Sequence, residues 1–256
     1  MILRTPGARR LGGLLGALAL ALAGLFAPAH AEPARGEPLA AALAPLGPLK
    51  SLATSLLWAR LLDEQLRGEG ERVAGLGRAL LELHPDLETV REYLANQLVV
   101  TEAPHAPGAA RHAALVAAGL ALLEQGLALR DSPRLHGALG RMLVTQRRSD
   151  PAFRAAAEAW AGDDLEIVAL LHLRRSELEP LDRVLLAALL LERGEHELDA
   201  GDAWAARRDW QDACAALEPL RALEGARIDG QLDGLRGRLR LAGVPPDGTG
   251  PLPGER

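Results

Sequence analysis

The sequence predicts an all-α fold, in which antiparallel helical hairpins stack into a short solenoid of about ten helices. The first observation is that Leu and Ala recur at three- and four-residue intervals from Leu49 to about Gly243, the spacing of amphipathic helices. The second is that Pro and Gly interrupt this pattern regularly, whereas no run rich in β-branched and aromatic residues does. Short connections place consecutive helices side by side and antiparallel.

The N-terminal segment has the pattern of a secretory signal peptide. Residues 1–10 carry Arg4, Arg9 and Arg10 and no acid, and residues 11–27 are an uncharged run of mostly Leu, Ala and Gly. The small-x-small sequence Ala29-His30-Ala31 follows, so we expect cleavage after Ala31 and a periplasmic or secreted protein. The alternative is a retained membrane anchor, but the run is shorter than the about 20 residues that span a bilayer. Sec and Tat export both remain open.

Two further segments flank the predicted helical-repeat domain, which covers residues 49–242. Residues 32–48 contain four prolines among Ala and Gly, which predicts a linker. Residues 243–256 are rich in Pro and Gly, which predicts a disordered tail.

The early helices are delimited by Gly and Pro. Helices are predicted over Leu49–Arg67, Glu71–Leu83, from Pro85 to about Thr101, and Ala109–Leu129, with a loop at Ala103–Gly108. In the fourth helix the small residues Ala114, Ala118 and Ala121 predict close approach of a neighbouring helix.

The later helices are delimited by capping residues. Ser132-Pro133 and Asp150-Pro151 each pair an N-cap side chain with a proline in the first turn. Capping boxes are predicted at Asp163 with Glu166 and at Ser176 with Glu179. Three further helices are predicted, one containing Leu185–Leu191, one over Asp202–Leu217 and one over Leu220–Leu241. The apolar run Leu185–Leu191 predicts an internal helix, and the acids that follow, Glu192 to Asp202, predict a solvated inter-helix loop.

Part of the chain resembles the tetratricopeptide repeat family. The first match is carried by Trp58, Leu61 and Ala74, with Pro85 one position early, and the second by Leu139-Gly140 followed by Ala152, Ala156 and Ala159. Gln65 stands where the family has a tyrosine, and residues 85–133 exceed the family's period of about 34 residues. The resemblance covers about half of the exported chain. It implies stacked helical hairpins that contact other proteins, and it supplies no catalytic residues.

Composition narrows the possible partners. Removing the leader leaves 26 Lys and Arg against 34 acids, a net charge of −8, which argues against nucleic acid because that partner needs a basic face.

Cys214 is the single cysteine, so an intrachain disulfide is impossible. It shares a helical stripe with Trp210, which predicts a small buried hydrophobe.

Motifs for catalysis or cofactor binding are lacking in the sequence. There is no Gly-x-Ser-x-Gly elbow, no His-Glu-x-x-His, no Ca²⁺ loop and no phosphate-binding Gly-Lys-Ser turn. His105 and His112, seven residues apart, can share a face but need further ligands to hold a metal.

The pairs Arg147-Arg148 and Arg174-Arg175 lie near predicted helix ends, where they complement the helix dipole. Together with Arg207-Arg208 they could alternatively grip carboxylates.

These observations favour an exported interaction scaffold that has no catalytic residues, no cofactor and no metal. If the repeat resemblance holds, Arg60, Asn96, Arg134 and Arg141 are the expected polar contacts of a partner groove for a protein or peptide, with no nucleic acid bound and no stable membrane insertion after cleavage. The alternative is a non-catalytic helical domain that binds a small anionic or metal ligand through Arg or His. A third hypothesis is an enzyme with an unrecognised site.

Overall fold

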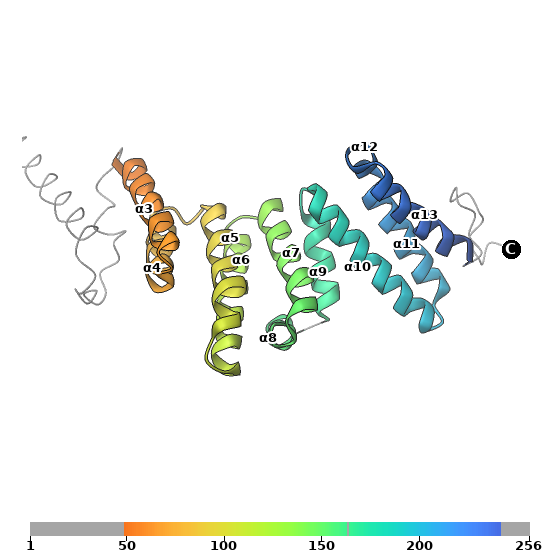
Figure 1. The fold of residues 1–256 in the computed structure, drawn as a ribbon, viewed down its shortest axis with the longest axis horizontal. Coiled ribbons are helices and arrows are strands. Elements are labelled where there is room, and N and C mark those ends of the chain that lie inside the picture. Colours follow the sequence, from red (N-terminus) through yellow and green to blue (C-terminus); the bar gives the residue numbers. More distant parts are fainter. Residues whose placement is uncertain (1–48, 163, 242–256) are drawn as a thin grey trace, which may run out of the picture. The chain divides into compact units, whose positions relative to one another are not determined.

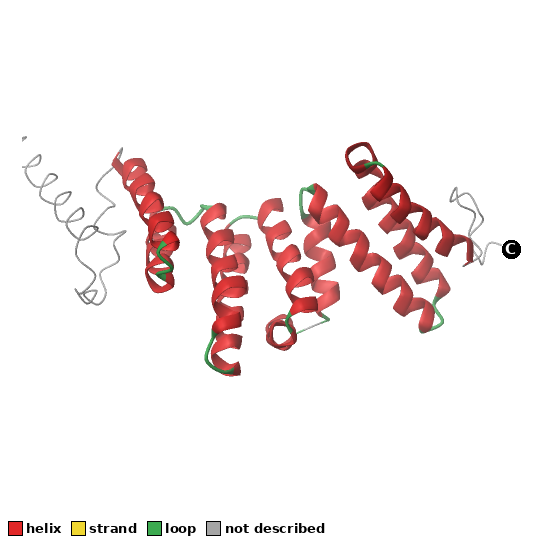
Figure 2. Ribbon diagram, in the orientation of Figure 1, coloured by secondary structure: helices red, strands yellow, loops and turns green. Residues whose placement is uncertain are grey.

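The computed structural model describes residues 49–162 and 164–241, and its regular elements there are all helical (Figures 1 and 2). This confirms the predicted all-α class. The predicted signal peptide (1–31), linker (32–48) and tail (243–256) lie outside the described residues. The chain divides into two compact units with their boundary between Leu94 and Ala95.

The first unit contains a helical hairpin followed by most of a third helix. Its elements are α3 (Leu49–Leu66), α4 (Gly70–Leu83) and the part of α5 (Glu88–Asn96) that ends at Leu94. Leu57 and Leu61 of α3 are fully buried, as is Leu80 of α4. Gly68 turns the chain between α3 and α4 with a φ of +75°, which a residue with a side chain rarely adopts.

The second unit begins at Ala95 and contains the remaining helices. They are the π-helical segment η2 (Gln97–Glu102), the 3₁₀ turn η3 (Ala103–His105), α6 (Ala109–Leu129), α7 (Pro133–Ser149), α8 (Pro151–Ala161), α9 (Leu165–Arg175), α10 (Pro180–Asp199), α11 (Ala203–Leu217), the 3₁₀ turn η4 (Glu218–Leu220), α12 (Arg221–Glu224) and α13 (Ala226–Leu241). α10 packs along α11, α7 along α9, and α6 against α8. One continuous core of mostly Leu and Ala joins them.

Two helix starts in the second unit follow the predicted capping chemistry. The Ser132 side chain accepts a hydrogen bond from the Leu135 backbone N–H at 3.4 Å. Asp150 Oδ1 accepts two, from Ala152 at 2.9 Å and from Phe153 at 3.1 Å. Pro133 and Pro151 each occupy the first turn, where no N–H is needed.

Three later predictions of helix ends and loops were wrong. Ser176 ends α9 instead of opening α10, which begins at Pro180 without a side-chain cap from Glu179. The acids from Glu192 to Asp199 belong to α10 and not to a loop. The predicted helix over Leu220–Leu241 is broken at Gly225, whose φ is +46°. Asp163 lies outside the described residues, and Asp164 caps α9 by accepting from Glu166 N–H at 2.8 Å.

The close approach predicted for α6 uses a different residue. Ala114 and Ala118 are exposed, so they do not form a contact face. A Cβ placed on Gly119 would instead lie 2.5 Å from Val99 Cγ2 and 3.1 Å from the Ala95 carbonyl oxygen. Glycine therefore allows α6 to contact the segment that precedes it.

Two glycines do the same for α7. A Cβ on Gly140 would lie 2.7 Å from Leu173 Cγ of α9, and one on Gly137 would lie 2.9 Å from Asp182 Oδ2 of α10. Gly140 therefore packs against α9, whereas Ala152 and Ala159, two small residues of the second repeat match, are exposed on α8.

Among the described residues, α6 is the one helix with the length and apolar composition of a membrane span. Its buried residues include Val116, Leu120 and Leu123, which belong to the core of the second unit. A core helix of a folded domain has the same length and composition, so this feature does not by itself indicate a membrane.

The contact between Gly194 and Trp210 gives a test of the packing of α10 on α11. A Cβ at position 194 would lie 2.5 Å from Trp210 Nε1, whereas one at position 230 would meet nothing within 4 Å. We expect Gly194→Ala to lower the free energy of unfolding by about 1–3 kcal/mol through overpacking. Gly230→Ala, the matched control, should raise it by about 1 kcal/mol through helix propensity. Urea denaturation measures both, and equal effects would contradict the packing described.

Candidate functional site

The four predicted groove residues have different surroundings. Arg60 lies on α3, where Nη2 is 2.6 Å from Oε1 of the buried Glu64. Arg141 lies on α7, where Nη1 donates at 2.8 Å to Oδ1 of the buried Asp182. Both arginines therefore neutralise a carboxylate inside their own unit.

The other two groove residues are on the surface of the second unit. Asn96, the last residue of α5, and Arg134, in the first turn of α7, are both exposed. Both side chains are accessible to a partner. Arg141 already pairs with Asp182, so it is less available for the contact that the sequence predicts.

A buried arginine, Arg147, connects three helices of the second unit. Its side chain is 2% exposed, and it donates from Nη1 to Glu166 of α9 and from Nη2 to Glu192 of α10, the latter at 2.7 Å. Its Nε is buried without a hydrogen-bond partner. Arg148, its neighbour in sequence, is 49% exposed and also donates to Glu192, at 2.8 Å. Arg147 therefore does more than complement a helix dipole, the role that the sequence predicts for it.

The charges around Glu192 alter its titration. Burial raises the pKa of this carboxyl, but the hydrogen bond from Arg148 and the positive charges of Arg147 and Arg148 outweigh burial. The net result is a pKa below the ordinary value, so Glu192 stays ionised and holds both arginines.

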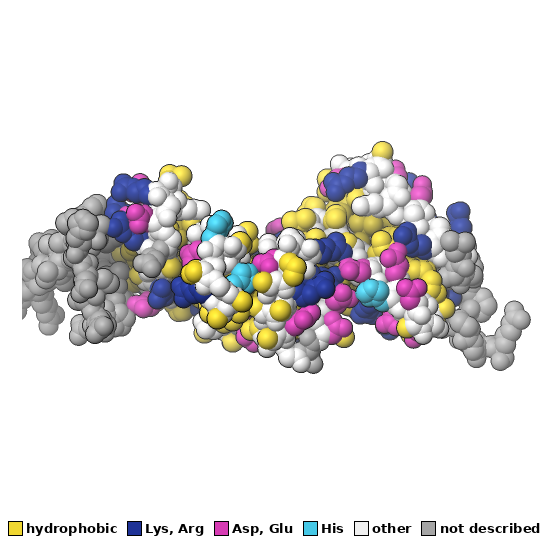
Figure 3. Space-filling model, turned by 60° about the horizontal axis from the view of Figure 1, so that its bottom comes forward, with side chains coloured by type: hydrophobic (Ala, Val, Ile, Leu, Met, Phe, Trp, Pro, Cys, Tyr) yellow, Lys and Arg dark blue, Asp and Glu magenta, His cyan; other side chains and the backbone are white. Residues whose placement is uncertain are grey.

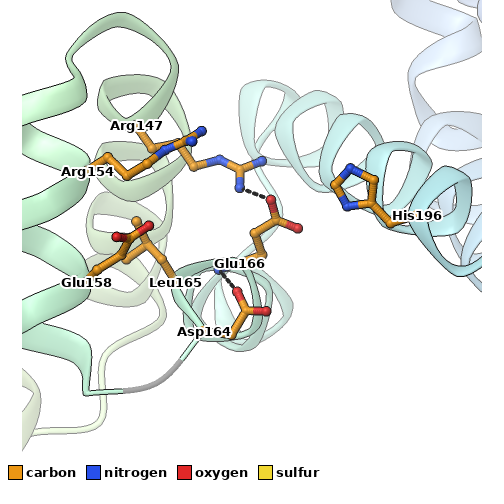
Figure 4. A pocket seen from close by; sticks show the side chains of 7 residues that line it. All are labelled: Arg147, Arg154, Glu158, Asp164, Leu165, Glu166 and His196. Carbon is orange, nitrogen blue, oxygen red and sulfur yellow. Dashed lines mark hydrogen bonds and ion pairs between the residues drawn. The ribbon is translucent and has the colours of Figure 1, made fainter. Parts of the chain in front are cut away.

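A cavity of about 380 Å³ lies beside Arg147, and we call it the α8–α10 cavity (Figure 4). It is lined by Arg147, Arg154, Glu158, Asp164, Leu165, Glu166 and His196. These residues come from α7, α8, the start of α9, and α10, and Figure 4 shows their side chains around a common space.

Arg154 and Glu158 are the most available charges of this cavity. They lie one turn apart on α8, both exposed, and neither side chain has a hydrogen bond or ion pair among the residues that the structure describes. His196 is exposed on the opposite side, on α10. The sequence gives no signal for this grouping, because its members are brought together only by the packing of separate helices.

The α8–α10 cavity contains both signs of charge. Two arginines and three carboxylates line it, together with one histidine. Mixed charge also characterises the wider face of the second unit drawn in Figure 3, where basic and acidic side chains are interspersed. Within the described ranges, no group of three or more His, Cys, Asp or Glu side chains could hold a metal ion.

Two histidines form a hydrogen-bonded pair between α7 and α9. His136 Nδ1 and His172 Nδ1 are 2.7 Å apart, and His136 Nε2 is 2.7 Å from Asp131 Oδ1. A carboxylate oxygen accepts, so Nε2 of His136 is the donor in its contact with Asp131. In a neutral His136, Nδ1 then accepts from the Nδ1–H of His172.

Burial is the main reason that His172 stays neutral near pH 7. Burial, and after it the positive charges of His136 and Arg175, lower the pKa of His172 from 6.5 to about 4. By contrast, the predicted pair His105 and His112 has separate partners: His105 Nδ1 is 2.8 Å from the Thr101 carbonyl oxygen, and His112 Nε2 is 2.9 Å from Asp150 Oδ2.

Comparisons with protein families, with curated proteins and with solved structures found no match for this chain. Its function is therefore inferred from its own residues.

The adjacent arginines of α7 provide a matched test of the buried ion pairs. We expect Arg147→Ala to lower the free energy of unfolding by about 3 kcal/mol, because it leaves Glu166 without its arginine and removes the buried one of the two arginines that pair with Glu192. Arg148→Ala should lower it by less than about 1 kcal/mol, since the side chain is half exposed. Urea denaturation at neutral pH compares the two, and similar losses would show that Arg147 has no special role.

The histidine pair predicts a specific pH dependence of stability. Between pH 6.5 and about 4 the unfolded chain binds a proton at His172 that the folded chain does not bind. The free energy of unfolding should therefore fall as the pH drops through this range, by at most about 1.4 kcal/mol per pH unit. Replacing His172 with Asn should flatten this slope.

Stability is best measured between pH 4.5 and 7. The pKa values of Glu192 and Asp150 are lowered, so protonation of these two carboxylates changes the stability only below this range. His105→Asn is the control, since His105 is exposed and contacts only the backbone of its own segment. It should keep the slope of the parent protein. A His172→Asn protein with the parent slope would show that the pair does not govern the response.

Proposed function

We propose that this chain is an exported helical-hairpin scaffold that binds a segment of another protein and catalyses no reaction. The observation that carries this proposal is the α8–α10 cavity, where Arg154 and Glu158 present opposite charges without partners among the described residues.

The mixture of charges indicates the kind of ligand. A polypeptide segment can place an acidic side chain near Arg154 and a basic one near Glu158, and its backbone can fill the remaining hydrogen-bonding positions. A small anion would bind near three carboxylates, and a metal ion near two arginines. Either ligand would therefore be repelled by charged side chains of the lining, which makes the small anionic or metal ligand the weaker candidate.

Other features agree with the scaffold proposal. The second unit has packed helical pairs of the kind that repeat proteins use for binding. The tetratricopeptide-like spacing of Trp58, Leu61 and Ala74 implies the same role. The N-terminal pattern that ends at Ala31 supports action in the periplasm or outside the cell.

Site-specific photocrosslinking in the native host tests this proposal. A photoreactive amino acid replaces Glu158 at the cavity, and a second protein carries it at the exposed Glu82 of α4 as the matched control. We expect position 158 to give one discrete protein adduct that position 82 does not give. Adding Arg154→Glu should abolish the adduct, because it reverses the charge that the partner contacts.

Two results would contradict the scaffold proposal. The first is the same set of adducts from positions 158 and 82, which would indicate random collision. The second is a small molecule bound in equal amount to the purified protein, detected by native mass spectrometry and lost in Arg154→Glu. That result would favour the ligand-binding alternative.

A further inference from the structure

Among the large apolar side chains that the second unit exposes outside the α8–α10 cavity, three lie on α9 and α11. Ile167 and Leu171 of α9 are 47% and 52% exposed, and Trp204 of α11 is 48% exposed. Full exposure of such side chains to water is unfavourable at about 25 cal/mol per Å² of apolar area. Large apolar side chains exposed together on one face are typical of an interaction surface.

Helical spacing and one ion pair bring these side chains onto a common face. On α9, Ile167, Leu171 and Arg174 are separated by four and three residues, so they share one side of the helix. On α11, Trp204, Arg208 and Asp212 are separated by four residues each. Arg174 Nη2 donates to Asp212 Oδ2 at 2.6 Å, which joins the two rows. We call these six residues the α9–α11 face.

The charge of the α9–α11 face is positive. The single carboxylate of the six, Asp212, is already paired with Arg174. The Arg208 guanidinium lies 5.2 Å from the centre of the Trp204 ring and has no ion pair among the described residues. Arg175, next to Arg174 and exposed, also lacks an ion pair within the described part of the chain. These cations stand out in a chain whose formal net charge is −5.

Apolar side chains flanked by available arginines are complementary to an acidic amphipathic segment. A helix with Leu or Phe on one side and Asp or Glu at its edges could cover Ile167, Leu171 and Trp204 while its carboxylates meet Arg175 and Arg208. Arginine binds carboxylates through two parallel N–H donors, and Trp and Arg are the residues that contribute most at protein interfaces. A basic segment would instead meet unpaired like charges.

We propose that the α9–α11 face is the docking surface for an acidic amphipathic segment of a partner protein. This inference rests on the proposed scaffold function, and it adds a second contact surface and the chemical class of the partner. It assigns a role to Arg175 and Arg208, members of two of the arginine pairs that the sequence contains.

Peptide display tests this proposal and does not require the partner to be identified. A random library of peptides of about 16 residues, long enough for four helical turns, is selected on the purified protein at physiological salt. We expect the enriched peptides to place Leu or Phe at helical spacing beside several Asp or Glu. A fluorescein-labelled copy of the most enriched peptide then serves as the probe for fluorescence anisotropy.

The probe should bind the Leu171→Glu and Arg208→Glu variants at least about tenfold more weakly, a loss of about 1.4 kcal/mol. Leu129→Glu is the matched control: Leu129 is 62% exposed at the end of α6, outside the face, so the affinity should not change. All these side chains are exposed, and urea denaturation verifies that the variants remain folded. Affinity should also weaken as the salt concentration rises.

Several outcomes would overturn the proposal. Enriched peptides without acidic residues would do so, as would a probe that binds Leu171→Glu as well as the parent. If no peptide is enriched above the level seen with a Leu171→Glu and Arg208→Glu double variant, the face is not a docking surface. If only Arg154→Glu abolishes binding, the peptide binds at the α8–α10 cavity and not at the α9–α11 face. That result would contradict this inference but not the proposed scaffold function.

Discussion

The buried guanidinium of Arg147 ties three helices of the second unit together. A charge with 2% of its side chain exposed needs opposite charges close by. Glu166 supplies one from α9 and Glu192 another from α10, so the C-terminal turn of α7 is tied to both helices. Glu166 also lines the α8–α10 cavity, and α9 carries Leu171 on its outer side. The cavity and the α9–α11 face therefore both depend on the position in which this ion pair fixes α9.

Most helix limits could be predicted because the chemistry that sets them is local. Ser132 and Asp150 cap the helices that the sequence assigns to them, since a cap needs only N–H groups two or three residues further along. The same reasoning failed at Ser176, where a serine followed by Glu179 has the spacing of a capping box. Pro180 fits the first turn of α10 better, which places the start of the helix after Glu179.

The candidate site could not be predicted, because its contacts join residues that are distant in the chain. Arg147 and Arg148 are identical and adjacent in sequence, yet one is buried and the other exposed. The two partners of Arg147 lie 19 and 45 residues away, and the nearer one, Glu166, is not shared with Arg148. His136 and His172 are similarly 36 residues apart. Only tertiary packing selects such partners, and one sequence contains no periodic signal that reports it.

The glycines of α7 have a consequence for how the second unit folds. Gly137 and Gly140 allow Asp182 and Leu173 to approach the helix backbone, but each weakens an isolated helix by about 1 kcal/mol relative to alanine. An isolated segment of this length is marginal even with favourable residues. α7 should therefore be helical only once α9 and α10 are in place around it. The folding of α7 is then coupled to its docking on α9 and α10, so a change that loosens either neighbour should also loosen α7.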